Sequence, residues 1–448
     1  MMFEPLYTAE EMRAVEAGHD VKQLMRRAGG ALAEFILEEY DDESSVTVVC
    51  GPGNNGGDGQ VAARRLRQAN WDVRVVESKP EDEEKDLGKP GLIVDAVFGT
   101  GFTGEPRPGA ARLIDQINSA GVDVVAVDVP SGVDASTGEV AGAVVDATWT
   151  VTFHREKVGL YVAPGTLHRG ELEVVDIGLQ DRETVFARPT TEILDLVPLR
   201  SPGDTKYTAG SVLVVGGSPG LTGAACLAAR AAFRADAGYV AVAAPRASLP
   251  VLEQQLLEAV KRPLEEVWDA VGRARSLALG PGLGRSEGAK ELVRRLLEET
   301  DLPAVVDADA LFDLDPFTRT APTVLTPHSG ELGRLLDVDS SWIDAHRLEA
   351  SRRAVERFNC VLLLKGEGTI VAAPDEQTLI CPGFPSLATA GTGDVLTGII
   401  GSFLAKGLDA RLAAAAAVTA HTEAAAEAPQ RAGLIASDVI EMLPYVLG

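Results

Sequence analysis

Each half of this 448-residue chain contains a glycine loop at the start of a helix pattern. In the first half the apolar run Val46–Cys50 passes directly into Gly51-Pro-Gly-Asn-Asn-Gly-Gly-Asp-Gly59. In the second half Gly391-Thr-Gly-Asp394 opens a stretch of small and apolar residues. Glycine lets the backbone approach a ligand with its N–H groups turned inward, and an aspartate among such amides can bind a cation or take a proton. Because the two loops differ in sequence and context, they predict two different sites and two linked activities.

Length and charge limit the class of protein. A chain of 448 residues is too long for one ordinary core, and 46% hydrophobic residues are typical of folded domains. The net charge of −25 argues against nucleic acid as a partner, because phosphates need basic surface. The acidic composition fits adaptation to high salt and an ordinary acidic cytosolic enzyme about equally well.

The cysteines and the ends of the chain favour the cytoplasm. Cys50, Cys226, Cys360 and Cys381 are far apart and form no Cys-x-x-Cys pair, so neither a metal site nor a disulfide framework is expected. The first residues lack the basic start and apolar core of a signal peptide. The run 413–417 is too short to cross a membrane. We therefore expect a cytoplasmic protein with no membrane partner.

The first half alternates strand and helix patterns. Strand-like runs at 46–50, 73–76, 92–95, 122–128 and 148–153 accompany helix-like stretches at 60–68 and 110–118. This order predicts a parallel sheet covered on both faces, with ligands at the carboxyl ends of its strands. The loops 51–59, 95–104 and 128–134 all fall at that edge.

A polar segment at 180–208 separates the halves and predicts two domains, about 1–200 and 205–448. The second half restarts with strand 211–215 and a glycine-rich turn at 216–220. Further strand-like runs lie at 239–243, 276–279, 304–306, 323–325 and 360–364. Helix patterns cover 287–299, 342–358, 393–405 and 410–426, which predicts a second α/β domain.

In the first half, the segment 54–58 is suited to an anionic group because backbone amides and a helix N-terminus converge there. It is neither a Walker loop nor Gly-x-Gly-x-x-Gly, and by itself it also fits a tight strand-to-helix turn. Together, the strand-end loops carry enough Asn, Asp and Ser oxygens to hold a small cation and a polar ligand. Lys157 follows another strand and could exchange protons with a substrate, although a lone lysine is more often a surface charge.

These motifs resemble the NAD(P)H-hydrate epimerase family over about residues 12–178. The resemblance implies a Rossmann-like three-layer sandwich that binds the hydrated nicotinamide nucleotide. Asp128 would face the substrate and act with Lys157 as the acid–base pair, and Asn55, Asp95 and Ser131 would bind a potassium ion. The implied substrate contacts are Asn54, Asn55, Gly56, Gly57, Asp58, Gly99, Thr100, Gly101, Phe102, Thr103, Gly104, Glu105 and Asp128.

In the second half, Asp394 could take a proton from a substrate hydroxyl while the amides of 391–393 stabilise charge on a transferred phosphoryl group. Lys365 and Thr369, in Lys-Gly-Glu-Gly-Thr, suit a phosphate or nucleotide. By itself, Gly-Thr-Gly-Asp also fits a plain helix start, and His328 a turn residue. The pairs Asp307/Asp309 and Cys226/Cys381 are interpreted as structural.

With their companion motifs these residues resemble the ADP-dependent NAD(P)H-hydrate dehydratase family, which has a ribokinase-like fold, over about residues 205–443. The resemblance implies hydrate contacts at Ala224, Gly282, His328 and Asp394, with Asp394 as the base. It also implies that ADP, with magnesium, is bound by Lys365, Gly366, Glu367, Gly368, Thr369 and Gly393.

The sequence therefore predicts a bifunctional, homo-oligomeric enzyme that acts on hydrated NADH and NADPH (NADHX and NADPHX). One domain would interconvert the R and S epimers and the other would dehydrate the S form with ADP. The route through a phosphorylated hydroxyl is a hypothesis beside direct acid-catalysed loss of water. The alternative function is a ribokinase-like small-molecule kinase fused to a non-catalytic binding or self-association module.

Overall fold

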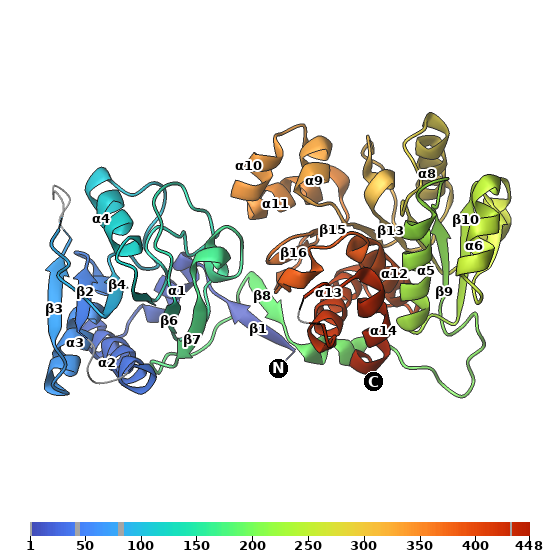
Figure 1. Cartoon of the computed structure of the whole chain (residues 1–448). Helices are drawn as coiled ribbons and strands as arrows, with labels where there is room; N and C mark the ends of the chain where they lie inside the picture. Colours follow the sequence, from blue (N-terminus) through green and yellow to red (C-terminus); the bar gives the residue numbers. More distant parts are fainter. Residues whose placement is uncertain (1, 41–44, 79–84, 431) are drawn as a thin grey trace. The chain divides into compact units, whose positions relative to one another are not determined.

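The computed structural model describes residues 2–40, 45–78, 85–430 and 432–448. The chain divides into two compact units, Pro5–Phe186 and a second one that contains Ala187–Gly448 together with the first few residues (Figure 1). The division falls inside the 180–208 segment. Residues 187–200, placed in the first domain by the sequence analysis, belong to the second unit.

The first unit is built on a parallel sheet, with six strands among the described residues. Each strand pairs in parallel with its neighbours. The central strands are buried along their whole length, as a sheet covered on both faces requires. The order is β3 (Val73–Glu77), β2 (Val46–Cys50), β4 (Leu92–Ala96), β5 (Asp123–Val127), β6 (Trp149–Phe153) and β7 (Glu171–Val175).

Helices cover both faces of this sheet (Figure 1). On one face, α2 (Val21–Glu39) and α3 (Asn54–Gln68) pack Leu32, Ile36 and Leu66 into the core. On the other face, α4 (Pro108–Asn118) buries Ile114 and Ile117 against the sheet. A short helix, α1 (Ala9–Glu16), begins at a capping box between Thr8 and Glu11, which satisfies its first amides.

The second unit contains a larger mixed sheet, which numbers eleven strands within the described residues. The strands from β11 to β15 along the sheet are parallel, while β15–β16 and β16–β17 are antiparallel pairs. The order is β1 (Phe3–Leu6), β8 (Phe186–Pro189), β17 (Thr378–Cys381), β16 (Thr369–Ala372), β15 (Val361–Leu364), β14 (Thr323–Leu325), β13 (Ala304–Val306), β12 (Ser276–Leu279), β9 (Ser211–Val215), β10 (Tyr239–Ala244) and β11 (Val260–Pro263).

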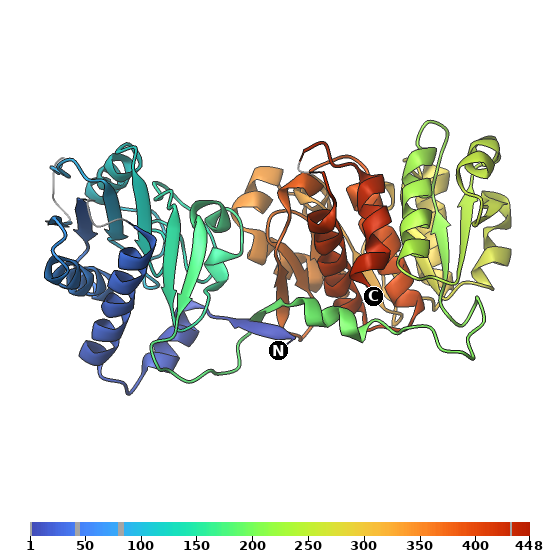
Figure 2. The ribbon, with the colours of Figure 1, turned by 60° about the horizontal axis from the view of Figure 1, so that its bottom comes forward.

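One face of this sheet is covered by α5 (Thr222–Arg234), α12 (Thr392–Ala405), α13 (Ala410–Glu427) and α14 (Ala436–Val446). Small residues let α5 and α12 approach closely, since a Cβ at Gly398 would lie 2.2 Å from the carbonyl oxygen of Ala228. Figure 2 shows the green segment with η3 (Thr191–Leu196) beside α13. The remaining helices are α6 (Leu249–Gln255), α7 (Val267–Val271), α8 (Glu287–Glu299), α9 (Ser329–Leu336), α10 (Ser340–Ala345) and α11 (Arg347–Phe358).

The expected two-domain α/β fold is confirmed, but local details differ, and strands β1, β7, β8 and β11 were not predicted. Helix α3 begins at Asn54, six residues before the predicted start at residue 60. The predicted helix 342–358 is two helices in the structure, because the helical conformation is interrupted at His346. The antiparallel pair β16–β17 was not predicted. Among the described residues, no helix is both long and apolar enough for a membrane span.

Candidate active sites

A cavity of about 610 Å³ lies at the carboxyl edge of the sheet in the first unit. The loops after β2, β4, β5 and β6 contribute to its wall, as parallel-sheet geometry predicts. Of the predicted site residues, those lining the cavity are Asn54, Asn55, Asp58, Gly99, Thr100, Gly101, Phe102, Thr103, Asp128 and Lys157.

Of the predicted substrate contacts, Gly56, Gly57, Gly104 and Glu105 do not line the cavity. Two of them allow close packing of α3. A Cβ at Gly56 would lie 1.9 Å from the carbonyl oxygen of Gly51, and one at Gly57 would lie 2.4 Å from Met25. These two glycines therefore act through the packing of α3 and not by contact with the cavity.

Asp128 and Lys157 form a buried ion pair. The Lys157 ammonium, 0% exposed, donates to Asp128 Oδ1 at 2.5 Å, to Thr152 Oγ1 at 2.9 Å and to the Phe153 carbonyl at 2.8 Å. Asp128 has a φ of 69°, a left-handed conformation that costs about 1–2 kcal/mol for a side-chain-bearing residue. The backbone at this strand end therefore holds the carboxylate over the cavity.

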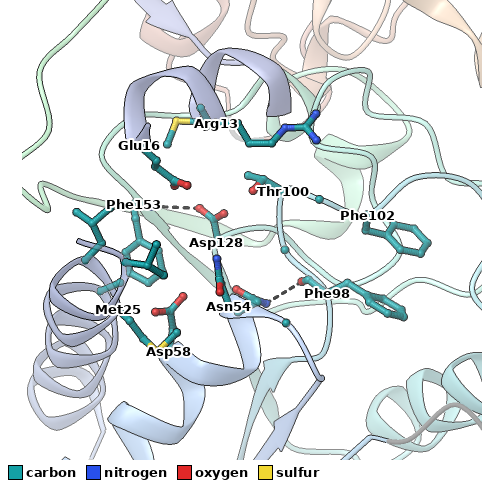
Figure 3. A pocket seen from close by; sticks show the side chains of 18 of the residues that line it. Arg13, Glu16, Met25, Asn54, Asp58, Phe98, Thr100, Phe102, Asp128 and Phe153 are labelled. Carbon is teal, nitrogen blue, oxygen red and sulfur yellow. Dashed lines mark hydrogen bonds between the residues drawn. The ribbon is translucent and has the colours of Figure 1, made fainter. Parts of the chain in front are cut away.

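Two further carboxyl groups, those of Glu16 and Asp58, point toward the same space (Figure 3). Burial, followed by repulsion from Asp128 and Glu16, raises the pKa of Asp58 to about 8. Burial and Asp128 also raise the pKa of Glu16, against the opposing effect of Lys157. Near neutral pH, Asp58 is thus a neutral acid that can donate a proton.

Asn55, Asp95 and Ser131 converge next to the cavity. Asp95, 0% exposed, accepts from the Ser131 hydroxyl at 2.7 Å, the Ser131 amide at 2.8 Å and the Val97 amide at 3.2 Å. Asn55 donates to the Phe98 carbonyl at 2.8 Å, and this leaves its own oxygen available. Burial raises the pKa of Asp95 to about 6, although the Ser131 and Val97 hydrogen bonds oppose this. The Ser131 hydroxyl oxygen also accepts from the Phe98 amide at 2.8 Å. Among the described residues no charged side chain acts on Asp95, so its carboxylate and the Asn55 oxygen fit a weakly charged cation.

The wall contributed by α1 was not predicted. Met12, Arg13 and Glu16 line the cavity from this helix, and Leu24 and Met25 line it from α2. The amphipathic pattern predicted a helix at this position, but no local signal shows which loop edge the helix will cover. Glu16 is the functional candidate that the sequence analysis missed.

In the second unit, Asp307, His328 and Lys365 each follow the end of a parallel strand, respectively β13, β14 and β15. Helix α12 directs its N-terminus to the same place, because a Cβ at Gly393 would lie 3.7 Å from Lys365 Nζ. The structure thus brings together Lys365, Gly393 and Asp394, as predicted. It also adds Asp307, which the sequence analysis had interpreted as structural.

Lys365 and Asp394 are coupled through Asp307. Lys365 Nζ donates to Asp307 Oδ1 at 2.7 Å and lies 3.7 Å from Glu331 Oε2. Burial disfavours the Lys365 ammonium, but Asp307, Glu331 and Asp394 outweigh it and raise its pKa. Burial and Asp307 raise the pKa of Asp394 to about 7, against the opposing effect of Lys365. A carboxylate with this pKa suits a general base at neutral pH.

The loop from Lys365 to Thr369 is supported from behind by Arg347. This guanidinium, 5% exposed, lies 3.3 Å from the carbonyl oxygens of Leu364 and Lys365 and 3.5 Å from that of Gly368. Burial lowers the pKa of Arg347 to about 10, which still leaves it charged at neutral pH. Carbonyls held inward in this way leave the other side of the loop for a ligand.

Two of the predicted hydrate contacts, Ala224 and Gly282, lie together. A Cβ at Gly282 would lie 3.3 Å from the Ala224 Cβ, so the loop after β12 meets the start of α5. Ser218, after β9, donates its amide to the Gly282 carbonyl at 2.7 Å. His328 is the N-cap of α9, where its Nδ1 accepts from the Gly330 amide at 3.0 Å, and its side chain remains 56% exposed. His328 is therefore a capping residue whose ring still reaches solvent.

Comparison with known families covers both units. Residues 212–444 match a family described as NAD(P)H-hydrate dehydratase, and residues 21–87 and 75–159 match one described as YjeF-related protein N-terminus. A crystal structure of the ADP/ATP-dependent NAD(P)H-hydrate dehydratase from Bacillus subtilis, co-crystallised with ATP and Mg²⁺, is 31% identical. It aligns with a TM-score of 0.53 over 57% of this chain and 96% of that one.

Curated relatives match nearly the whole chain. The bifunctional NAD(P)H-hydrate repair enzyme of Moorella thermoacetica is 39% identical over 95% of this chain and 92% of the relative. The enzymes of the same description from Coxiella burnetii and Escherichia coli are 36% and 35% identical, over 96% and 90% of their own lengths. Both units are therefore matched in the same order within single relatives.

Proposed function

We infer that this chain, which belongs to the family of bifunctional NAD(P)H-hydrate repair enzymes, repairs hydrated NADH and NADPH in two linked steps. The first unit epimerises R and S NAD(P)HX, and the second dehydrates the S form with an adenine nucleotide. The observation that carries this proposal is that one chain retains both polar clusters, Asp128 with Lys157 and Asp394 with Lys365. A decayed binding module would have no need to keep a buried lysine–aspartate pair.

Epimerisation needs an acid and a base on the two faces of C6. The bond from C6 to its hydroxyl oxygen breaks as the oxygen gains a proton, and water then adds to the opposite face and loses one. We assign the donated proton to Asp58, which burial keeps neutral. The proton from the entering water goes to Asp128, whose carboxylate Lys157 fixes by a 2.5 Å hydrogen bond.

We propose that a potassium ion is held by Asn55, Asp95 and Ser131. The fully buried Asp95 carboxylate and the available Asn55 oxygen fit such an ion. When bound, the ion supplies positive charge that offsets this carboxylate. The residues around it keep the loops after β2, β4 and β5 together below the substrate.

In the second unit, we propose that Asp394 accepts the proton of the substrate hydroxyl. The hydroxyl oxygen then attacks the terminal phosphoryl group of the nucleotide, and the bond from that phosphorus to the bridging oxygen breaks, so that AMP leaves from ADP or ADP leaves from ATP. The amides of 391–393 stabilise the charge on the transferred group. Phosphate leaves C6 with the bonding electrons and a proton is lost from C5, which restores the dihydronicotinamide ring. Magnesium arrives with the nucleotide, whose phosphates supply most of its ligands.

The test is a direct assay of both steps. Mixed R and S hydrates are incubated with the protein and either ADP or ATP, while NADH absorbance and the remaining epimers are followed. We expect both epimers to be consumed and NADH to appear only with nucleotide. Formation of a stable phosphorylated product without NADH would instead identify a small-molecule kinase. Light scattering tests the expected homo-oligomer.

A further inference from the structure

Asp307 is a buried carboxylate in the second site that contacts two different elements. Its side chain is 2% exposed, and each of its carboxylate oxygens has a different partner. Oδ1 accepts from the Lys365 ammonium at 2.7 Å, and Oδ2 accepts from the Thr397 hydroxyl at 2.7 Å. One buried carboxylate thus connects the end of β15 to helix α12.

The second partner leads back to the glycine loop. The Thr397 hydroxyl also lies 3.1 Å from the carbonyl oxygen of Gly393, one helical turn earlier. Asp394 is the residue next to Gly393, and it lies in the first turn of the helix that Thr397 holds. Asp307 therefore links the first turns of α12, which carry Asp394, to Lys365 at the end of β15.

We propose that Asp307 is a positioning residue for dehydration: its carboxylate holds the Lys365 ammonium and the first turns of α12 together, and its charge sets how readily Asp394 accepts the substrate proton. This inference rests on the proposed dehydratase function. It differs from a purely structural role, because the charge of Asp307 acts on Asp394 independently of the hydrogen bonds.

The charged and titratable groups around Asp394 come from several elements. Asp307 and Asp309 follow β13, and both raise the pKa of Asp394. Lys365 follows β15 and opposes them, while Glu331 on α9 faces Lys365 at 3.7 Å. His421 on α13 hydrogen-bonds to the backbone of Thr392, and burial lowers its pKa to about 4, so it is neutral in the working range. Asp309 pairs with Arg285 at 2.9 Å, which offsets much of its charge. Asp307 is thus the strongest anionic influence on Asp394.

The sign of the effect follows from these charges. Asp307→Asn removes a negative neighbour of Asp394 and also leaves the Lys365 ammonium without its main partner. Both changes favour the ionised form of Asp394, so its pKa falls and it becomes a weaker base. Lys365 retains Glu331 within 3.7 Å, so we expect the variant to fold.

The experiment measures the pH dependence of nucleotide-dependent dehydration of S-NADHX by the full-length protein and its variants. For Asp307→Asn we expect the acidic limb of the pH profile of kcat to move about one pH unit toward lower pH, which is the usual effect of one neighbouring charge. The maximal rate should fall by less than about tenfold, because a base weaker by one pKa unit loses at most that factor. Asp307→Ser, which is also neutral, should move the limb in the same direction and serves as the second variant.

Two matched controls separate charge from tethering. Thr397→Val removes the helix contact without changing charge, so it should lower the rate and leave the limb in place. Asp309→Asn removes a carboxylate already paired with Arg285, so it should move the limb less than Asp307→Asn.

The outcomes distinguish this inference from the proposed function. Wild-type protein without nucleotide-dependent NADH formation would refute the function itself. The inference would be overturned if the wild type is active and both Asp307 variants fold and bind ADP, but the acidic limb of their pH profiles lies where it does in the wild type. An equal movement in Thr397→Val would show that tethering alone is responsible and would overturn the role of charge.

Discussion

Asp58 gives the sharpest test of the first site, because the same burial that makes it an acid also costs stability. The residue is 9% exposed, and within the described part of the chain its carboxyl makes no hydrogen bond to another side chain. Its pKa rises from 3.8 to about 8, mainly through burial and secondly through Asp128. We predict that Asp58→Asn stabilises the first unit at alkaline pH and abolishes epimerisation.

The sign follows from proton linkage. Between the unfolded pKa of 3.8 and the folded pKa of about 8, the folded protein keeps a proton that the unfolded chain has lost. Stability from this carboxyl is therefore fully present below the lower value and is lost as the pH rises through the upper one. A difference of about four in pKa corresponds to about 5 kcal/mol. Solvent on the open side of the cavity screens part of this, so we expect the asparagine variant to gain about 2–4 kcal/mol above pH 8.

The assay is urea unfolding of the full-length protein at several pH values, with hydrogen exchange to identify transitions of the first unit. Asp115→Asn, an exposed carboxylate on α4, is the control and should change stability by less than about 0.5 kcal/mol at any pH. Epimerisation by Asp58→Asn should fall about 10²–10⁴-fold while dehydration of the S hydrate continues. A stability difference that is the same at acidic and alkaline pH would show that Asp58 is already ionised in the folded protein, and the acid role would then be wrong.

Three further predictions concern the remaining parts of the molecule. Asp394→Asn should lower nucleotide-dependent NADH recovery by about 10²–10⁴-fold with ADP binding retained in calorimetry, and near-normal turnover would remove Asp394 from the mechanism. Asp95→Ala should weaken potassium binding and slow epimerisation but not dehydration, and a diffraction map with potassium or a heavier analogue that shows no cation beside Asp95 would contradict this. A fragment of residues 186–448 should unfold at higher urea concentration than one of residues 205–448, because only the longer fragment keeps β8 and the fully buried Ile193 of η3; equal midpoints would show that this segment adds nothing.

The strands were the most predictable part of the fold. β9, β12, β13 and β14 lie where their apolar runs predicted, because buried parallel strands show as short continuous apolar segments. The start of α3 was missed for a physical reason. Three glycines in its first turns suggest a loop, but they are required there, since Gly56 approaches the Gly51 carbonyl and Gly59 approaches Ala96. The hairpin β16–β17 has a local signal that the sequence analysis did not use, namely a Pro374-Asp375 turn between two apolar runs. The helix break at His346 depends on packing.

The sites were predictable to the extent that their residues follow strands. Asp128, Lys365 and Asp394 could be chosen because each stands at a strand end or a helix start in a recognisable motif. Asp307 stands at the end of β13 by the same rule, so its position could have been used. Its partners could not be predicted, because Thr397 is 90 residues away in the chain and meets it only through packing of α12 against the sheet. Glu16 reaches the first cavity through the placement of α1, which is likewise a tertiary property.

Burial serves an acid in the first site and a base in the second. In each site the pKa of an aspartate near the N-terminus of a helix is raised. Burial is the largest cause, and a neighbouring carboxylate is the second. The nearby lysines act differently: Lys365 opposes the rise in the pKa of Asp394, whereas Lys157 is hydrogen-bonded to Asp128 and not to Asp58. Opposition from Lys365 favours the ionised form of Asp394, which accepts a proton, while burial and the neighbouring carboxylates favour the protonated form of Asp58, which donates one. Conversion of the R epimer to NADH needs an ionised Asp394 and a protonated Asp58 at once, so we expect the coupled reaction to slow at acidic pH, where Asp394 is protonated, and at alkaline pH, where Asp58 is ionised.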